Sequence, residues 1–502
     1  MRRQRPLHPF GVPLPRWHGG GTGSALLLPC EAGEGDPKGG GGVAAALMSI
    51  AIALFSTPAY SETLTGTLTG TDHQTYKEIP FRVPAGTTSV TVAFAYTGQD
   101  QKSVIDLGIR DPQRFRGWSG GNKSAFTLTE TWATPSYLPG PLPAGEWKLI
   151  LGVPNLRKDA RAAYTATITL DQGSAFHGFT AAPLNDEPGW YRGDLHLHTG
   201  HSDGSCAAQS GTKVPCPVHK TLDAAVARGL DFVAVTDHNT SSHFQALAEL
   251  QTHYDRLLLI PGREVTTFQG HANIIGMTAP LDFQLGSGRA PTFAHVLGQA
   301  EAAGALVTIN HPGLPSGEAC MGCGWTAPVD FGRIAGVEVI NGGIVSGPLS
   351  GLPFWTARLE EGHRLTAVGG SDNHDATLDP TKANSVGRPT TVVFARNLSQ
   401  DAILAGIRAG RVFIDVQGTR NRLLDVSQIA GQLTIRVAHG AGGKVTLVGP
   451  GAPLMPARDL PGDDETLRIE LPADLKGWLR TEVRGPDGAL WLLGNPVYLT
   501  SP

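Results

Sequence analysis

The sequence has little of what marks a nucleic-acid-binding or membrane-spanning protein. Charged residues make up only 17% of its 502 residues, and 40 Lys and Arg against 44 Asp and Glu leave a net charge of −4. No basic patch stands out, so no stable nucleic-acid partner is expected. The apolar run within residues 43–61 is shorter than the about 20 residues that a membrane span needs.

That apolar run is typical of a secretory signal. It is followed by the small residues Ala59 and Ser61, which predict cleavage near Ser61–Glu62. The residues before it are rich in Gly and Pro, and we expect the natural start at or near Met48. Residues 1–61 are therefore interpreted as a leader and signal peptide, with no membrane span after cleavage. A periplasmic or secreted protein is expected, and an uncleaved anchor is the alternative.

Cysteine is also scarce, with five in the chain, of which Cys30 lies in the leader. The even number that remains predicts disulfides in an exported protein. We favour Cys206–Cys216 and Cys320–Cys323, which close two loops, although four cysteines allow three connectivities. A redox motif, Cys-Met-Gly-Cys at 320–323, is the alternative for the second pair.

The most informative stretch is Asp-Leu-His-Leu-His-Thr-Gly-His-Ser-Asp-Gly at 194–204. His196 and His198 are two residues apart, and side chains alternate along a strand, so both imidazoles point to the same side. Asp203 adds a carboxylate just beyond the predicted strand. Imidazole and carboxylate together suit divalent Zn, Mn or Fe.

Metal-type residues recur at the ends of later apolar runs, namely Asp237 and His238, Glu264, His271, His311, and Asp372 and His374. Helical segments are predicted between these runs at 220–228, 242–254, 292–303 and 353–363. Repeated βα units place the carboxyl ends of their strands at one face, where β/α barrels hold their active sites. The pattern thus predicts a shared site built from many strand ends.

The order of these motifs resembles the PHP (polymerase and histidinol phosphatase) superfamily of metallohydrolases. The matching motifs are D-L-H-x-H-T-x-x-S-D-G, T-D-H-N, P-G-x-E, G-H-x-N, N-H-P and G-S-D-x-H, over about 189–415. More narrowly, they resemble the branch named after the carbaryl hydrolases CehA and McbA. The resemblance implies an α/β fold, a distorted (β/α)7 TIM-like barrel, with two or three metal ions.

The resemblance also implies which residues bind each ion: His196, His198 and Asp372 the first; Glu264, bridging first and second, with His271 and His311; and Asp203, His238 and His374 the third. Asp237 is predicted to orient an imidazole. Arg263 is a candidate for binding an anionic oxygen, and the alternative is that strand alternation points it away from Glu264. Asn239, Asn273 and Asn310 are interpreted as supporting or turn residues. The remaining histidines considered are expected in solvent or in supporting positions: His201, His219, His243, His253, His295 and His363.

A hydroxide that bridges two cations is a nucleophile near neutral pH. We therefore predict an exported metal-dependent hydrolase that cleaves a small-molecule phosphoester, either a monoester or a diester. A carbamate or carboxylic ester hydrolase is the alternative, and an inactive surface- or carbohydrate-binding protein is the second alternative. A converging Arg or Lys would favour a phosphoester, whereas an aromatic pocket from Phe268, Trp325, Phe354 and Trp355 would favour an aryl carbamate.

Strand-like alternation flanks the predicted barrel on both sides. Runs at 88–96, 146–153 and 163–170, punctuated by Pro and Gly, predict an amino-terminal β-sandwich over 62–175. The barrel is expected over 185–418, closed by a helix at 400–409, and a small β-sandwich over 422–502. The oligomeric state is not predicted.

Overall fold

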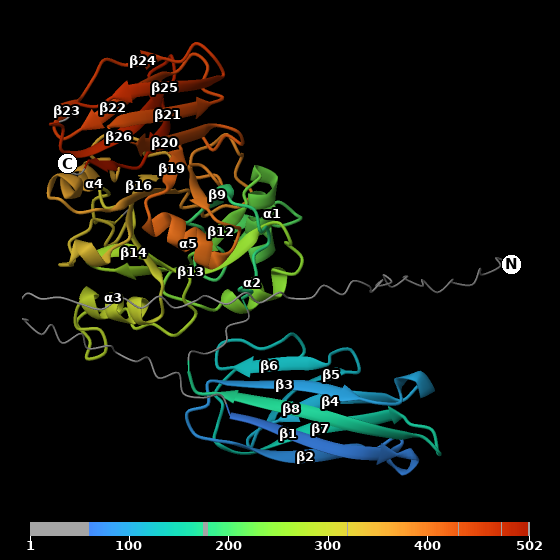
Figure 1. Cartoon of the computed structure of the whole chain (residues 1–502). Coiled ribbons are helices and arrows are strands. Elements are labelled where there is room, and N and C mark those ends of the chain that lie inside the picture. The colour runs from blue at the N-terminus through green and yellow to red at the C-terminus, as the bar shows by residue number, and fades with distance from the viewer. Residues whose placement is uncertain (1–59, 174–178, 319, 430, 473, 500–502) are drawn as a thin grey trace, which may run out of the picture. The chain divides into compact units, whose positions relative to one another are not determined.

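The protein is mixed α/β, with mostly strands and few helices. A computed structural model describes residues 60–173, 179–318, 320–429, 431–472 and 474–499 (Figure 1). The predicted leader and signal lie outside these residues, apart from Tyr60 and Ser61, which begin the first strand. Within the described part, no helix is long and apolar enough to cross a membrane.

The amino-terminal strands form two antiparallel four-stranded sheets. One has the order β1-β8-β3-β6 and the other the order β2-β7-β4-β5. The bounds are β1 Tyr60–Thr69, β2 Tyr76–Val83, β3 Ser89–Tyr96, β4 Val104–Arg110, β5 Phe115–Gly120, β6 Ala125–Thr129, β7 Gly145–Asn155 and β8 Arg161–Asp171. Exposed and buried residues alternate along β8, and its buried side chains share a core with Trp147.

The second region is organised around a long curved sheet whose first strands run in the order β17-β16-β15-β14-β13-β12-β9. Their bounds are β9 Gly189–Asp194, β12 Phe232–Val235, β13 Leu258–Thr267, β14 Gly270–Ile275, β15 Leu306–Ile309, β16 Gly336–Asn341 and β17 Thr366–Gly370. β12 is parallel to β9 and β13, and β16 is parallel to β15 and β17. Most residues in these strands are buried, as is usual for parallel strands covered on both faces.

The two ends of this strand series meet just beyond β9 and β17. Leu197 and Asn373 form a parallel bridge. The His198 amide donates to the Asn373 carbonyl at 3.0 Å, and the Asp372 amide donates to the His196 carbonyl at 3.0 Å. The sheet therefore curls until its first and last strand ends are hydrogen-bonded.

The helices are fewer than a regular βα repeat requires. They are α1 Val218–Arg228, α2 Phe244–Leu250, α3 Phe293–Ala302, α4 Leu352–Glu360 and α5 Gln400–Arg408. No helix separates β13 from β14; instead the two strands form an antiparallel hairpin, in which Thr267 pairs with Gly270. A regular TIM barrel is therefore not evident in the described residues.

Several of the carboxyl-terminal strands continue the same sheet. β18 (Thr390–Ala395) and β19 (Val412–Asp415) follow β9, and β19 pairs with β27 (Leu490–Gly494). The remaining strands are β20 Leu423–Ile429, β21 Gln432–Ala438, β22 Lys444–Gly449, β23 Ala452–Pro453, β24 Arg458–Asp459, β25 Asp464–Glu470, β26 Gly477–Arg484 and β28 Val497–Leu499. Of these, β20, β21 and β25 form a separate three-stranded sheet. The prediction of a small β-sandwich over 422–502 did not include the pairing of β19 with β27.

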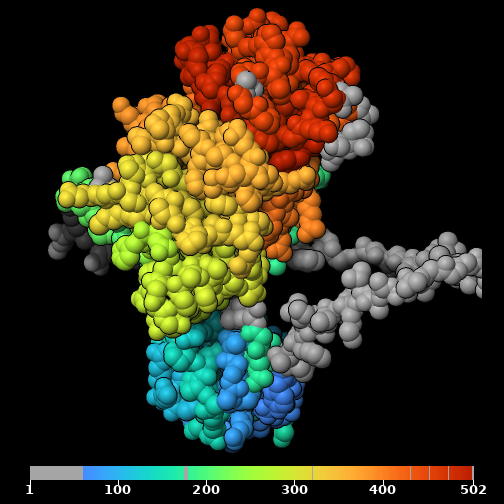
Figure 2. All heavy atoms as spheres, turned by 90° about the vertical axis from the view of Figure 1, so that its left-hand side faces the viewer, coloured from blue at the N-terminus to red at the C-terminus, as the bar shows by residue number. Residues whose placement is uncertain are grey.

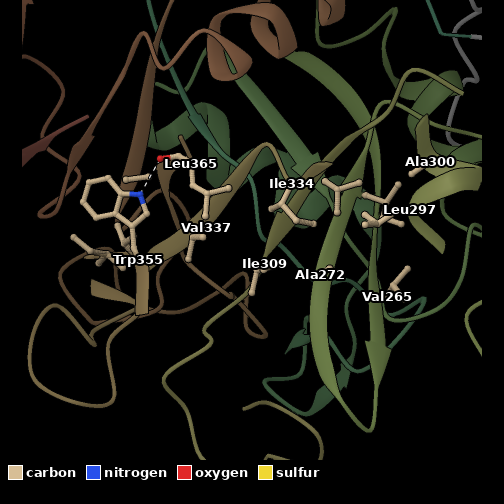
Figure 3. Close-up of a cluster of buried hydrophobic side chains, with 14 of the residues drawn as sticks. Val265, Ala272, Leu297, Ala300, Ile309, Ile334, Val337, Trp355 and Leu365 are labelled. Carbon is tan, nitrogen blue, oxygen red and sulfur yellow. Dashed lines mark hydrogen bonds between the residues drawn. The ribbon is translucent and has the colours of Figure 1, made fainter. Parts of the chain in front are cut away.

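The largest buried side chain of the second region is Trp355 of α4, which is fully buried. Figure 3 shows it at one end of a cluster that includes Val337, Ile309 and Ile334. Its indole Nε1 donates to the Leu365 carbonyl at 2.8 Å. Figure 2 shows one face of the molecule, on which residues of about 300–400 are yellow to orange.

Trp355→Ala is expected to destabilise the fold by about 3–5 kcal/mol, because it removes a large buried side chain and leaves a cavity. The Leu365 carbonyl also loses its donor. Chemical denaturation monitored by fluorescence and circular dichroism would measure the loss. Val226→Ala, at a position 51% exposed on α1, is the control and should change stability by less than about 0.5 kcal/mol.

Candidate metal centre

The ends of the curved sheet's strands bring the predicted ligands together. His196 and His198 directly follow β9, His238 follows β12, and His311 follows β15. The β13–β14 hairpin and the turn after β17 supply the others, which are Glu264, His271, Asp372 and His374. Asp203 lies in the loop between β9 and the short hairpin of β10 (Ser205–Ala207) and β11 (Lys213–Pro215).

Glu264 lies at the middle of the cluster and is completely buried. Its Oε2 lies 3.3 Å from His196 Nε2 and 3.5 Å from His198 Nε2. Its Oε1 lies 3.3 Å from His271 Nδ1 and 3.2 Å from His311 Nε2. His238 Nδ1 lies closest of all, 2.9 Å from Oε2. Oε2 therefore faces three imidazoles and Oε1 faces two others.

Asp203 and Asp372 extend the cluster outward. Asp372 Oδ1 lies 3.1 Å from His198 Nε2 and 3.6 Å from His374 Nδ1. Asp203 Oδ1 lies 3.3 Å from His374 Nε2 and 3.6 Å from His238 Nε2. The Asp203 side chain is 58% exposed, whereas that of Glu264 is 1% exposed. The cluster thus runs from an enclosed inner part to an open edge.

Potential ligand atoms lie within 4.8 Å of one another in four groups: His198, Asp203, His238 and His374; His196, His198 and Glu264; His196, His311 and Asp372; and His271, His311 and Cys323. The first group contains the three residues predicted for the third ion. The second group contains His196 and His198, which are predicted for the first ion, and the bridging Glu264. The third adds His311 to residues predicted for the first ion. The fourth contains Cys323, which was predicted only as a disulfide cysteine.

Several polar atoms of the cluster are buried without a hydrogen-bond partner among the described residues. They include His196 Nε2, His271 Nδ1 and Glu264 Oε2. Leaving such atoms unsatisfied is costly, and all three are potential metal donors that face the centre. The donor set and its orientation therefore fit bound divalent cations.

The charges of the cluster are strongly coupled. Burial on its own would raise the pKa of Glu264, but the surrounding imidazoles, His196 foremost, hold it well below its usual range. For His374 the two effects have the opposite signs. Burial on its own would lower the pKa of His374, but the carboxylates of Asp203 and Asp372 raise it to about 9. Without a cation, the carboxylates are thus ionised and some imidazoles retain a proton at neutral pH.

Arg263 does not reach the cluster, contrary to the predicted role in gripping an anionic oxygen. In the β13–β14 hairpin Glu264 pairs with Asn273 and Arg263 pairs with Ile274, so Arg263 faces the opposite side of the sheet. Its guanidinium donates to the Ala279 carbonyl at 2.8 Å and lies 5.3 Å from the centre of the Phe244 ring.

Asp237 also differs from its predicted role. It accepts hydrogen bonds from the Thr199 amide at 2.8 Å and the Ser202 hydroxyl at 2.6 Å, and so holds the turn after His198. The imidazole it faces belongs to His243, at 3.3 Å, rather than to one of the predicted ligands. His243 is fully buried, whereas His201, His219, His253 and His295 are exposed and His363 is half-buried.

Two of the three asparagines have clear supporting contacts. Asn310 Nδ2 donates to Glu264 Oε1 at 2.9 Å, and Asn273 Nδ2 donates to the Leu195 carbonyl at 3.0 Å. Asn239 exchanges hydrogen bonds with the Thr266 backbone at 3.0 Å and has a φ of 51°, which suits its predicted turn role.

Glu338 is the supporting residue that sequence reasoning missed. It is buried within β16, and its Oε1 lies 3.0 Å from His196 Nδ1. Its Oε2 accepts from the His311 amide and the Asn341 amide group, each at 3.0 Å. A Cβ at Gly370 would lie 2.3 Å from Glu338 Oε1, so glycine makes room for this carboxylate. The available signal was a single carboxylate inside the apolar run Gly336–Asn341.

The comparisons with known proteins give distant likenesses. No family model matches the chain, and no curated protein matches it. A solved two-domain protein from Bacteroides vulgatus ATCC 8482, containing a predicted PHP-like metal-dependent phosphoesterase, is 21% identical, with 65% of this chain and 99% of that chain covered and a TM-score of 0.37.

Two further solved structures are more distant. PliG of Salmonella Typhimurium, a periplasmic inhibitor of g-type lysozyme, is 16% identical, with 22% of this chain and 87% of its own covered and a TM-score of 0.14. The Podospora anserina GH26-CBM35 β-(1,4)-mannanase is 11% identical, with coverages of 62% and 65% and a TM-score of 0.14. Likenesses of this strength do not define a function, which must come from the geometry of the cluster.

Glu338→Gln is expected to weaken metal binding by about 10–100-fold, because it removes the carboxylate that holds His196 Nδ1. Titration of metal-stripped protein with Zn²⁺ against a competing chelator would measure the change. Glu301→Gln, which alters an exposed ion pair with Arg333, is the matched control. Equal affinity for the two variants would contradict the assigned role.

Metal uptake at neutral pH is expected to release protons. His374, whose pKa is raised to about 9, must lose its proton before it can donate to a cation, so affinity should rise with pH up to about 9. Calorimetric titrations in two buffers of different ionisation enthalpy would detect the released protons. Heats that do not depend on the buffer would contradict this expectation.

Proposed function

We propose that this chain is a metal-dependent hydrolase of phosphoesters. The observation that supports this most directly is the two-sided arrangement around Glu264, whose two oxygens face separate sets of imidazoles, three at Oε2 and two at Oε1. A carboxylate placed in this way can bridge two divalent cations. When bound, such ions polarise a phosphoryl oxygen and lower the pKa of water, which supplies a nucleophile near neutral pH.

Some residues of the cluster would bind the ions, and others hold those ligands in position. His196, His198 and Asp372 would hold one ion, and His271 and His311 a second, with Glu264 shared between them. Glu338 orients His196 through a hydrogen bond of 3.0 Å. Asn310 orients Glu264 through a hydrogen bond of 2.9 Å. Fixed ligands of this kind reduce the reorganisation that accompanies reaction.

Asp203, His238 and His374 form the exposed edge of the cluster, where a small substrate can arrive from solvent. Burial of the inner residues keeps bulk water away from the carboxylate that both sides share. Asp203, His238 and His374 would hold a third, more exchangeable ion, which would supply further positive charge to stabilise the ester oxygens.

The proposal includes membership of the PHP superfamily and the distorted barrel fold of that superfamily. The motif order, together with the contact that joins the ends of β9 and β17, supports a distorted (β/α)7 barrel of the PHP superfamily. We place it over residues 185–418, between sandwiches at 62–175 and 422–502, and retain the CehA/McbA branch as the closer resemblance. The Cys206–Cys216 and Cys320–Cys323 disulfides are compatible with the proposed export to the periplasm or medium.

A carbamate or carboxylic ester is the second candidate substrate, and two observations favour it. A phosphoester would be favoured by a converging Arg or Lys, but Arg263 faces away from the cluster. Among the described residues, the ion pairs of the cluster's carboxylates involve imidazoles and no Arg or Lys. Phe268, at the turn beside His271, is 96% exposed, and Trp325 packs near Gly270. Trp355 is fully buried in the core, however, and cannot line an aromatic pocket.

The decisive assay compares three substrates: bis-p-nitrophenyl phosphate, p-nitrophenyl acetate and 1-naphthyl N-methylcarbamate. We expect two or three equivalents of Zn, Mn or Fe and turnover of the phosphoester. Glu264→Gln and His196→Ala should each lower that turnover by more than about 100-fold, because they remove ligands rather than supporting groups. His295→Ala, on an exposed face of α3, should leave it unchanged.

The other outcomes separate the alternatives. Carbamate or acetate turnover without phosphoester cleavage would assign the second substrate class. A protein that binds no transition metal after reconstitution and turns over none of the three substrates would contradict the hydrolase proposal for both substrate classes.

A further inference from the structure

The Cys320–Cys323 loop lies directly against the candidate metal centre. Its disulfide joins α-carbons 5.6 Å apart, and the Met321 carbonyl between them lies 3.1 Å from His271 Nε2. A carbonyl oxygen only accepts, so Nε2 carries the proton and Nδ1 is left free toward Glu264. The loop therefore selects the tautomer that exposes the metal-facing nitrogen of His271.

The sulfur of Cys323 lies among potential ligands. It is completely buried, and its Sγ, a His271 nitrogen and a His311 nitrogen all lie within 4.8 Å of one another. Two imidazoles and one thiolate are a donor set that suits Zn²⁺. In the oxidised loop this sulfur is bonded to Cys320 and is not available as a thiolate.

Resting on the proposed metal centre, we propose that Cys320–Cys323 is a redox-controlled part of it: cleavage of this disulfide makes Cys323 a metal ligand together with His271 and His311. The two cysteines differ in access. Cys320 is half-buried, whereas Cys323 is fully buried. An incoming thiolate can therefore attack Cys320 and release Cys323 as the leaving sulfur, beside the two imidazoles.

The electron balance requires a dithiol reductant. Its first thiolate forms a mixed disulfide with Cys320 as the Cys320–Cys323 bond breaks, and its second thiol closes the reductant's own disulfide and releases Cys320. Two electrons and two protons pass from the dithiol to the protein sulfurs. When Cys323 binds the cation, its proton passes to solvent.

Reduction should leave the loop in place, because backbone contacts hold it from both sides. Gly317 and Cys320 exchange backbone hydrogen bonds of 3.0 and 3.2 Å. The Thr326 amide donates to the Gln269 carbonyl at 2.7 Å. Gly322, with a φ of 82°, approaches the Thr267 carbonyl so closely that a Cβ would lie 2.1 Å from it. Cys323 thus stays beside His271 when the sulfur bridge opens.

The second disulfide provides an internal contrast. Cys206 and Cys216 are both buried, on β10 and next to β11, and neither sulfur belongs to a group of close ligand atoms in the described residues. Its opening would release no donor toward a cation. The redox response is therefore specific to the Cys320–Cys323 pair.

A matched pair of variants tests this assignment. Cys320→Ser and Cys323→Ser both remove the same bridge, but only Cys320→Ser leaves the thiol at position 323. Each metal-stripped full chain is titrated with Co²⁺, and the near-ultraviolet cobalt–thiolate charge-transfer absorption is recorded. Cys30, present in both variants, contributes equally to each.

Cys320→Ser is expected to show the cobalt–thiolate band without reductant. Cys323→Ser should bind Co²⁺ without the band. The wild-type protein should show the band only after reduction with a dithiol that is removed before Co²⁺ is added. A Cys206→Ser, Cys216→Ser double variant should behave like wild type.

Each contrary result has a distinct meaning. Cobalt uptake by Cys320→Ser with no thiolate band, or equal bands in both single variants, would overturn the ligand role of Cys323 and leave the proposed hydrolase intact. No cobalt uptake by any form, wild type included, would overturn the metal centre and this inference together.

Discussion

The arrangement of the second region depends on keeping one ionised carboxylate in its interior. Glu264 is buried, and an isolated charge in such a position would be strongly unfavourable. Imidazoles around both of its oxygens, together with the Asn310 amide, offset that cost. The strand ends must therefore converge on one point, and the contact between the ends of β9 and β17 follows from the same requirement.

Much of the candidate site could be predicted because its residues stand out against apolar surroundings. A histidine or aspartate at the end of a hydrophobic run is conspicuous, and strand ends in one sheet lie close together. Glu338 could not be assigned in this way, because it lies inside β16 and its partners come from other strands. For Arg263 the sequence left both faces of the strand open, and the pairing of β13 with β14 places it on the face opposite Glu264.

The fold was less predictable than the site. An apolar run does not reveal the direction of its strand, so the sequence did not distinguish the antiparallel β13–β14 hairpin from another βα unit. The pairing of β19 with β27 joins residues far apart in the chain, and local alternation contains no information about it. Trp355 likewise resembled a pocket aromatic until its packing beside Leu365 placed it in the core.

The β13–β14 hairpin places narrow limits on how this protein can diversify. Glu264 and His271 reach the same face because Glu264 pairs with Asn273 and Thr266 with His271 across a turn of only Phe268 and Gln269. A shift of one residue would turn one ligand to the opposite face. Length changes here would therefore be selected against, and new substrate preferences would have to arise from single substitutions at the turn or from the outer loops.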